Sequence, residues 1–306
     1  MHYKIQLYIF LFLRFSPFEE LWFPLNLHTF PSLSLSLFSF IHTHKNRQQR
    51  SMSNSKVPER LTLESVRKSL ITQEDTIIFS LIERAKHPLN SRLYNPSWNV
   101  IPGFSGTVFE YFVKETETIQ SKVGRYESPK EHPFFPENIS KPVFPPCYHP
   151  SVLHPAAKSI NINKDIWDVY INKLLPQFSA EGDDGNYATT ATCDLQCLQA
   201  LSRRIHYGMF VAEVKFIDAP QDYSPAIHAQ DRDALMKLLT FESVEEMVKK
   251  RVEKKTMLFA QDVSIHNDSN KEKTKIDPCA VSKLYADWIM PLTKHVQVEY
   301  LLRRLY

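Results

Sequence analysis

The sequence predicts an all-α fold. Between residues 61 and 306, apolar side chains recur every three or four positions, which is the spacing of amphipathic helices. Helix start signals accompany several of these stretches. No convincing alternation of apolar and polar residues, the pattern of a strand, occurs between residues 52 and 306. With 306 residues, of which 43% are apolar and 23% charged, the chain can bury a large core.

The first part of the helical body contains two predicted helices and a segment that cannot be helical. Residues 61–87 form one long amphipathic helix, because few helix breakers interrupt the apolar spacing. A second helix covers about residues 106–125. Residues 129–155 contain eight prolines, which remove backbone donors and favour extended geometry. Because this segment also contains several aromatic residues, we expect it to follow the surface in an ordered way.

Three further helices follow in the middle of the chain. One covers residues 163–175 and is expected to end at Pro176, because proline interrupts a helix. A long helix covers about residues 189–216. Ser243 and Glu246 have the spacing of a capping box, which predicts the start of another helix that continues to about residue 255. We assign no element to residues 217–242.

The last predicted helix begins at Asp277 and Pro278. An aspartate followed by proline is typical of an N-cap and the first helical position. We expect this helix to be kinked at Pro291 and to run to the C-terminus. The polar and charged residues 262–275 before it predict a solvated loop.

Residues 1–51 differ from the rest of the chain and are predicted to lie outside the domain, which covers residues 52–306. They contain an apolar run at 5–13 and a Ser-Leu repeat at 32–37. Three interpretations stay open: a translated leader followed by the true start at Met52, a plastid transit peptide, or a secretory signal. Of these we favour the start at Met52, which predicts a cytoplasmic protein.

The bulk charge excludes some classes of partner. A formal net charge of +3 gives no field that points to nucleic acid or to a membrane surface. The apolar run near the N-terminus is too short to span a bilayer. The four cysteines lack metal-binding spacing, and Cys193 and Cys197, one helical turn apart, fit buried small side chains. A charged substrate must therefore be held by a few local cations.

Two of these cations lie in the helix predicted over residues 189–216. Arg204 and Lys215 are eleven residues apart, which places them on one face at a separation of about 16 Å. Gly208 lies between them, although glycine inside a helix costs about 1 kcal/mol relative to alanine. Two explanations stay open: a hollow bounded by the two cations, or close packing of another helix on Gly208 with both cations solvated.

Four other polar residues are candidates on weaker evidence. Arg67 lies on a largely apolar helix stripe, so that its side chain either reaches solvent, pairs with an acid or points into a pocket. Thr293 and Gln297 are one turn apart on an otherwise apolar helix. Glu245 lies in a first helical turn, where the helix dipole already favours an acid.

At these residues the sequence resembles the eukaryotic, and especially the plant, chorismate mutases. The resemblance covers nearly all of residues 61–306, with its motifs in the family order, and it does not cover residues 1–51. The segments that carry it are residues 73–79, 128–136, 197–199, 201–208 and 299–305. It is closest to the cytosolic isoform of plants.

The resemblance implies a single all-helical domain, a homodimer, and one active site in each subunit that needs no cofactor or metal. The reaction is the intramolecular Claisen rearrangement of chorismate, a dicarboxylate, to prephenate. By motif position, Arg67 and Arg204 would bind the carboxylates, and Lys215 would donate to the ether oxygen. Gln297 would be a second donor to this oxygen, Glu245 would accept from the ring hydroxyl, and Thr293 would help to seat a carboxylate.

The chain also departs from the family. Gln297 replaces the glutamate of the fungal members, and an amide donates a hydrogen bond at every pH, whereas a carboxyl donates only when protonated. Phe241 replaces a fungal asparagine, which puts that contact to the hydroxyl in doubt. The regulated members bind tyrosine or tryptophan through an arginine pair and an Asn-aromatic-Gly-Ser loop. The corresponding residues, which predict a vestigial effector site, are Gly124, Arg125, Asn186, Ala188 and Thr189.

Three hypotheses of function follow. The leading one is an active cytosolic chorismate mutase that tyrosine and tryptophan do not regulate. The second is a catalytically inactive helical dimer that binds aromatic amino acids or a partner enzyme. The third is a secreted mutase, which requires residues 1–51 to act as a signal.

Overall fold

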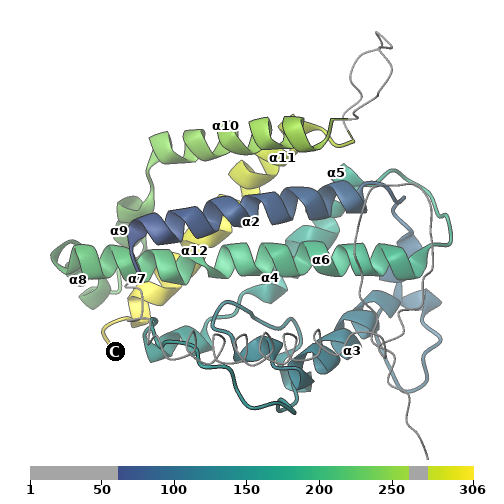
Figure 1. Ribbon diagram of the computed structural model, residues 1–306, viewed down its shortest axis with the longest axis horizontal. Helices are drawn as coiled ribbons and strands as arrows, with labels where there is room; N and C mark the ends of the chain where they lie inside the picture. The colour runs from purple at the N-terminus through teal and green to yellow at the C-terminus, as the bar shows by residue number, and fades with distance from the viewer. Residues whose placement is uncertain (1–60, 262–274) are drawn as a thin grey trace, which may run out of the picture. The chain divides into compact units, whose positions relative to one another are not determined.

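The computed structural model describes residues 61–261 and 275–306, and every regular element in these two ranges is helical (Figure 1). The prediction of an all-α fold is therefore confirmed. The N-terminal extension 1–51 and nearly all of the loop predicted over 262–275 lie outside the described residues.

Three long helices lie side by side, with α2 between α10 and α6 (Figure 1). Helix α2 covers Leu63–Arg84, α6 covers Tyr187–His206 and α10 covers Glu242–Phe259. The N-terminus of α2 is fixed by a capping box, because the side chain of Thr62 accepts from the amide of Ser65 and the Ser65 side chain accepts from that of Thr62. The buried face of α2 carries apolar residues such as Ile77, Ile78 and Leu81, as the helical spacing predicts.

Helices α7 (Gly208–Asp218) and α12 (Met290–Arg303) pack closely against each other. A Cβ atom at Gly208 would lie 2.7 Å from the backbone oxygen of Thr293, so only glycine permits this approach. The structure combines parts of the two explanations for Gly208, because α12 packs closely on it but Arg204 is buried rather than solvated. The helix predicted over 189–216 is divided at Tyr207 into α6 and α7.

Two prolines lie beside π-helical turns. Residues Tyr170–Leu174 form a π-helical turn between α4 (Asn163–Val169) and α5 (Leu175–Phe178). Pro176 lies in α5, which follows this π-helical turn without interruption and continues to Phe178, so the prediction that Pro176 ends the helix was wrong. A second π-helical turn, at Tyr285–Ile289, precedes Pro291, and the kink expected at this proline stays a prediction.

The C-terminal half shows two further departures from the prediction. Helices α8 (Pro220–His228) and α9 (Arg232–Leu239) lie within residues 217–242, for which the sequence predicts no element. The capping box at Ser243 was also wrong: α10 begins at Glu242 after Phe241, so Ser243 already lies in the first turn. Helix α11 (Pro278–Leu284) begins as predicted, because the side chain of Asp277 accepts from the amide of Cys279.

The proline-rich segment is anchored to helix α3 (Val108–Lys122) by a buried carboxylate. Glu117 accepts hydrogen bonds from the backbone amides of Phe134 and Phe135 at 2.9–3.0 Å, and from the hydroxyl of Tyr126. As predicted, residues 129–155 contain no α-helix. Short 3-10 turns lie at Ser91–Tyr94, Pro96–Trp98, Arg125–Glu127, Pro136–Asn138 and Pro155–Ser159.

Within 61–261 and 275–306, no helix combines the length and the apolar character that crossing a bilayer requires.

Candidate active site

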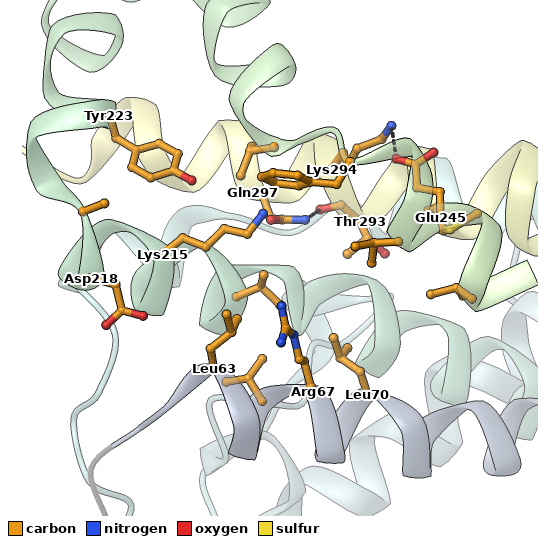
Figure 2. Close-up of a pocket in the computed structure, with 18 of the residues that line it drawn as sticks. Leu63, Arg67, Leu70, Lys215, Asp218, Tyr223, Glu245, Thr293, Lys294 and Gln297 are labelled. Carbon is orange, nitrogen blue, oxygen red and sulfur yellow. Dashed lines mark hydrogen bonds and ion pairs between the residues drawn. The ribbon is translucent and has the colours of Figure 1, made fainter. Parts of the chain in front are cut away.

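A cavity of about 410 Å³ lies among α2, α6, α7, α8, α9, α10 and α12 (Figure 2). Its lining includes all six residues that the sequence analysis assigned to an active site. These are Arg67, Arg204, Lys215, Glu245, Thr293 and Gln297. They come from five helices that are distant in sequence, so the tertiary fold brings the predicted set together.

Arg204 is a buried cation with donors that are not used. Its Nη1 donates to the hydroxyl of Thr293 at 3.3 Å, and its Nε has no hydrogen-bond partner among the described residues. Burial lowers the pKa of the Arg204 guanidinium, although arginine stays protonated at physiological pH. A buried cation without a paired acid is costly unless an anion completes the site. Arg204 therefore suits a carboxylate ligand.

Near Arg204, the carboxylate of Glu74 forms ion pairs with two other cations. Glu74 is completely buried and accepts from Arg251 at 2.6 and 2.9 Å, with the ammonium of Lys255 at 3.1 Å. Glu74 acts to raise the pKa of Arg204 electrostatically, but because it is already paired with these two cations it compensates the charge of Arg204 only in part. The pairing of Glu74 with these two cations was not predicted from the sequence.

Lys215 reaches into the cavity from α7, and its side chain points toward Gln297 (Figure 2). Burial lowers the pKa of its ammonium to about 8, and the positive charge of Arg67 acts in the same direction. The ammonium lies 4.7 Å from the centre of the Phe241 ring, a cation–π contact. Lys215 and Arg204 thus both border the cavity, although Gly208 between them serves helix packing.

The side chain of Arg67 extends from α2 into the same cavity (Figure 2). Its side chain lines the cavity and remains exposed to solvent. Of the three explanations left open for this arginine, two agree with the structure, since its side chain both lines the pocket and reaches solvent, and it pairs with no acid among the described residues.

Gln297 and Thr293 present neutral polar groups from α12. The Gln297 amide nitrogen donates to the backbone oxygen of Thr293 at 3.3 Å. An amide has two N–H groups, so one remains for a ligand. Its oxygen is buried and has no partner among the described residues. The Thr293 hydroxyl donates to the oxygen of Ile289 at 2.6 Å and accepts from Arg204.

The sequence analysis missed Lys294. Its ammonium lies 2.8 Å from a carboxylate oxygen of Glu245 and 3.3 Å from the hydroxyl of Thr240 (Figure 2). Both Lys294 and Glu245 line the cavity. The only signal in the sequence was position, since Lys294 follows Thr293 and precedes Gln297 by three residues.

The residues predicted to form a vestigial effector site do not meet within one chain. Arg125 binds Glu131 at 3.0 Å, and Glu131 also binds Arg203 near the end of α6. Asn186 precedes the first residue of α6 and donates to Asp184, and Ala188 and Thr189 are exposed in its first turn. Arg203 is 16 residues from Tyr187, so the two groups lie about 24 Å apart along α6.

In the described part of the chain, no group of three or more histidine, cysteine, aspartate or glutamate side chains could hold a metal ion. The cavity lining offers three cations without an ion-pair partner among the described residues, one amide and the Lys294–Glu245 ion pair, and two further carboxylates, Asp218 and Asp222, also belong to it. This set is suited to a small ligand with two negative charges.

Comparison with known proteins gives consistent matches. Residues 186–298 match the family chorismate mutase type II. Chorismate mutase 2 of Petunia hybrida is 63% identical over 248 residues, which cover 81% of this chain and 94% of that protein. The crystal structure of AtCM1 with tyrosine bound in the allosteric site has a TM-score of 0.74 and 55% identity, covering 82% of this chain and 99% of that chain. The crystal structure of the chloroplast chorismate mutase from Zea mays has a TM-score of 0.74 and 52% identity, and the match covers 82% of this chain and 98% of that chain.

Proposed function

Because this chain belongs to the chorismate mutase family and therefore converts chorismate to prephenate, we propose that the cavity bordered by Arg67, Arg204 and Lys215 is the active site. In this reaction the ether C–O bond breaks while a C–C bond forms within the same molecule, so no atom enters or leaves. The observation that carries the proposal is that all six candidate residues, from five helices, line one cavity.

The two arginines have the chemistry to hold the substrate in a reactive shape. Charge-assisted hydrogen bonds from Arg67 and Arg204 bind the two carboxylates, and the Thr293 hydroxyl helps to seat one of them. Holding both carboxylates selects the compact conformer in which the two reacting carbons are close together. Such positioning can supply several kcal/mol of the barrier reduction.

Lys215 and Gln297 act on the bond that breaks. Negative charge develops on the ether oxygen as the C–O bond lengthens, and donors placed beforehand at this point stabilise the transition state. The ammonium of Lys215 and the remaining N–H of Gln297 are these donors, and their side chains point toward each other in the cavity (Figure 2). Glu245 accepts from the ring hydroxyl and orients the ring.

The test is a direct assay of the purified protein. Chorismate should lose its absorbance and prephenate should appear without any added cofactor. Arg204→Gln, which cannot bind a carboxylate by charge, should lose at least about 100-fold in kcat/KM. An Arg204→Gln variant within twofold of wild type would overturn the assignment, and an inactive wild type would favour the binding-only alternative.

We further propose that the chain forms a homodimer, acts in the cytoplasm and is not regulated by tyrosine or tryptophan. Relatives of both cytosolic and chloroplastic kinds match it, so a plastid location is the alternative. Residues 1–51 fused to a fluorescent protein would decide between the two locations. Sedimentation of residues 52–306 would test the dimer.

A further inference from the structure

We propose that Lys294 is a positioning residue, which holds the Glu245 carboxylate in place and cancels its charge. This inference rests on the proposed function, because it assigns the residue that prepares one wall of the same cavity for a dianion. Lys294 is not one of the cations that bind the substrate.

The geometry distinguishes Lys294 from the other cations of the cavity. Its ammonium is 2.8 Å from Glu245 and also donates to the Thr240 hydroxyl at 3.3 Å. By contrast, none of Arg67, Arg204 and Lys215 has an ion-pair partner among residues 61–261 and 275–306. Lys294 is thus the cavity cation whose charge is already matched by an acid.

The ion pair of Lys294 and Glu245 is partly shielded from solvent. The side chains of Lys294 and Glu245 are only 18% and 30% exposed. Solvent therefore screens their interaction less than that of a surface pair. The two residues also join α12 to the first turn of α10, so that the ion pair fixes the carboxylate relative to Thr293 and Gln297.

Without Lys294, the Glu245 carboxylate would oppose catalysis in two ways. It would stand as an uncompensated negative charge beside a substrate that carries two carboxylates, which weakens substrate binding. It would also be able to rotate toward the amides at the start of its own helix, which attract anions. The first effect raises KM, and the second removes the acceptor for the ring hydroxyl.

The test is a double-mutant cycle of Lys294→Met and Glu245→Gln, measured as KM and kcat with chorismate. Lys294→Met alone should raise KM about 10-fold, because the bare carboxylate repels the substrate. In the Glu245→Gln background, where no negative charge remains to be cancelled, the same change should alter KM less than twofold. Lys294→Arg should restore KM to within about threefold of wild type.

The matched control is Lys249→Met. Lys249 pairs with Glu246 on α10 and does not line the cavity. Its loss should leave KM and kcat unchanged. Thermal unfolding of every variant separates folding from catalysis, and Lys294→Gln replaces Lys294→Met if the latter does not fold.

Other outcomes overturn the inference. An equal rise in KM in both backgrounds would mean that Lys294 binds the substrate directly. A lower melting temperature with unchanged KM would leave Lys294 only a structural role. The proposed function fails separately, if wild type does not consume chorismate, whereas the inference on Lys294 fails only through the cycle.

Discussion

At the scale of the residue, the surroundings of Lys215 determine how readily its side chain carries a positive charge. Burial and the neighbouring Arg67 both act against its positive charge, and the Phe241 ring compensates in part through its electron-rich face. No acid pairs with Lys215 among the described residues. Its charge is therefore available to an oxygen that becomes negative during the reaction.

Lys215→Ala should therefore lose catalysis and keep folding. Removing a donor to developing charge typically costs about 100- to 1000-fold in rate, or about 2.7–4 kcal/mol. Folding should be retained, because the ammonium makes no ion pair within the described chain. Turnover and thermal unfolding are measured for both the variant and wild type. If the variant keeps more than about a tenth of wild-type turnover, Lys215 is not the ether donor.

The pH dependence follows from the same lysine. Lys215 donates only when protonated, and its pKa of about 8 in the free protein means that the donor is lost as pH rises through 8. We expect kcat/KM to be nearly constant from pH 5 to about 7 and then to fall with a midpoint near 8, since kcat/KM reports the free enzyme. A dianionic substrate favours the ammonium, so kcat should fall at higher pH. A constant kcat/KM up to pH 9 would contradict this assignment.

Gln297 should be responsible for the constant part of this profile. Its amide donates at every pH, whereas a carboxyl at this position donates only when protonated. Gln297→Glu should therefore make the rate rise as the pH is lowered. Rates of both proteins between pH 4 and 9 would test this, and an identical acid limb would remove Gln297 from the site.

At the scale of the element, the sequence predicted the long helices well and the short ones poorly. The spacing of apolar residues predicted α2, α3 and α6, because each presents a stripe to the core over several turns. Helices α8 and α9 have only 9 and 8 residues, too few for such a stripe, and α8 carries an internal Pro225. Their position matters, because Tyr223 of α8 and Leu239 of α9 line the cavity.

Local signals also failed where tertiary contacts were decisive. The Ser243 and Glu246 spacing resembled a capping box, but the N-cap of α10 is Phe241, two residues before Ser243. The resemblance to a known family identified the six candidate residues, whereas their ion pairs could not be predicted. The Lys294 and Glu245 contact, for example, joins residues 49 positions apart on different helices.

Gly208→Ala tests how α7 and α12 approach each other. The added Cβ would lie 2.7 Å from the Thr293 backbone oxygen, which cannot move as a flexible side chain would. Overpacking of this kind typically costs about 1–3 kcal/mol. The displaced α12 should also reduce kcat, since Thr293 and Gln297 lie on it. Chemical denaturation would measure the stability, with Lys254→Ala on the exposed face of α10 as a control expected within about 0.5 kcal/mol of wild type.

At the scale of the whole molecule, the open question is whether distant sites communicate with the cavity. An effector shifts an enzyme between two states only through different affinity for them. The two groups of predicted effector residues lie about 24 Å apart along α6, so they could form one site only across two protomers. Within a protomer, Arg125 is already engaged by Glu131, which also holds Arg203.

We therefore expect tyrosine and tryptophan to have little effect. Gly124 has a φ of 88°, a conformation that an arginine side chain disfavours, so the second arginine of the regulated members does not fit this backbone well. Ala188 adds a methyl group where those members have glycine, and it crowds an amino acid that must pack against the start of α6. At sub-saturating chorismate, millimolar tyrosine or tryptophan should change turnover less than threefold. AtCM1, which holds tyrosine in its allosteric site, is the control for effector binding under the same conditions. A response of threefold or more would show that Thr189 and Arg125 still form a working site, and Ala188→Gly with Thr189→Ser should then strengthen it.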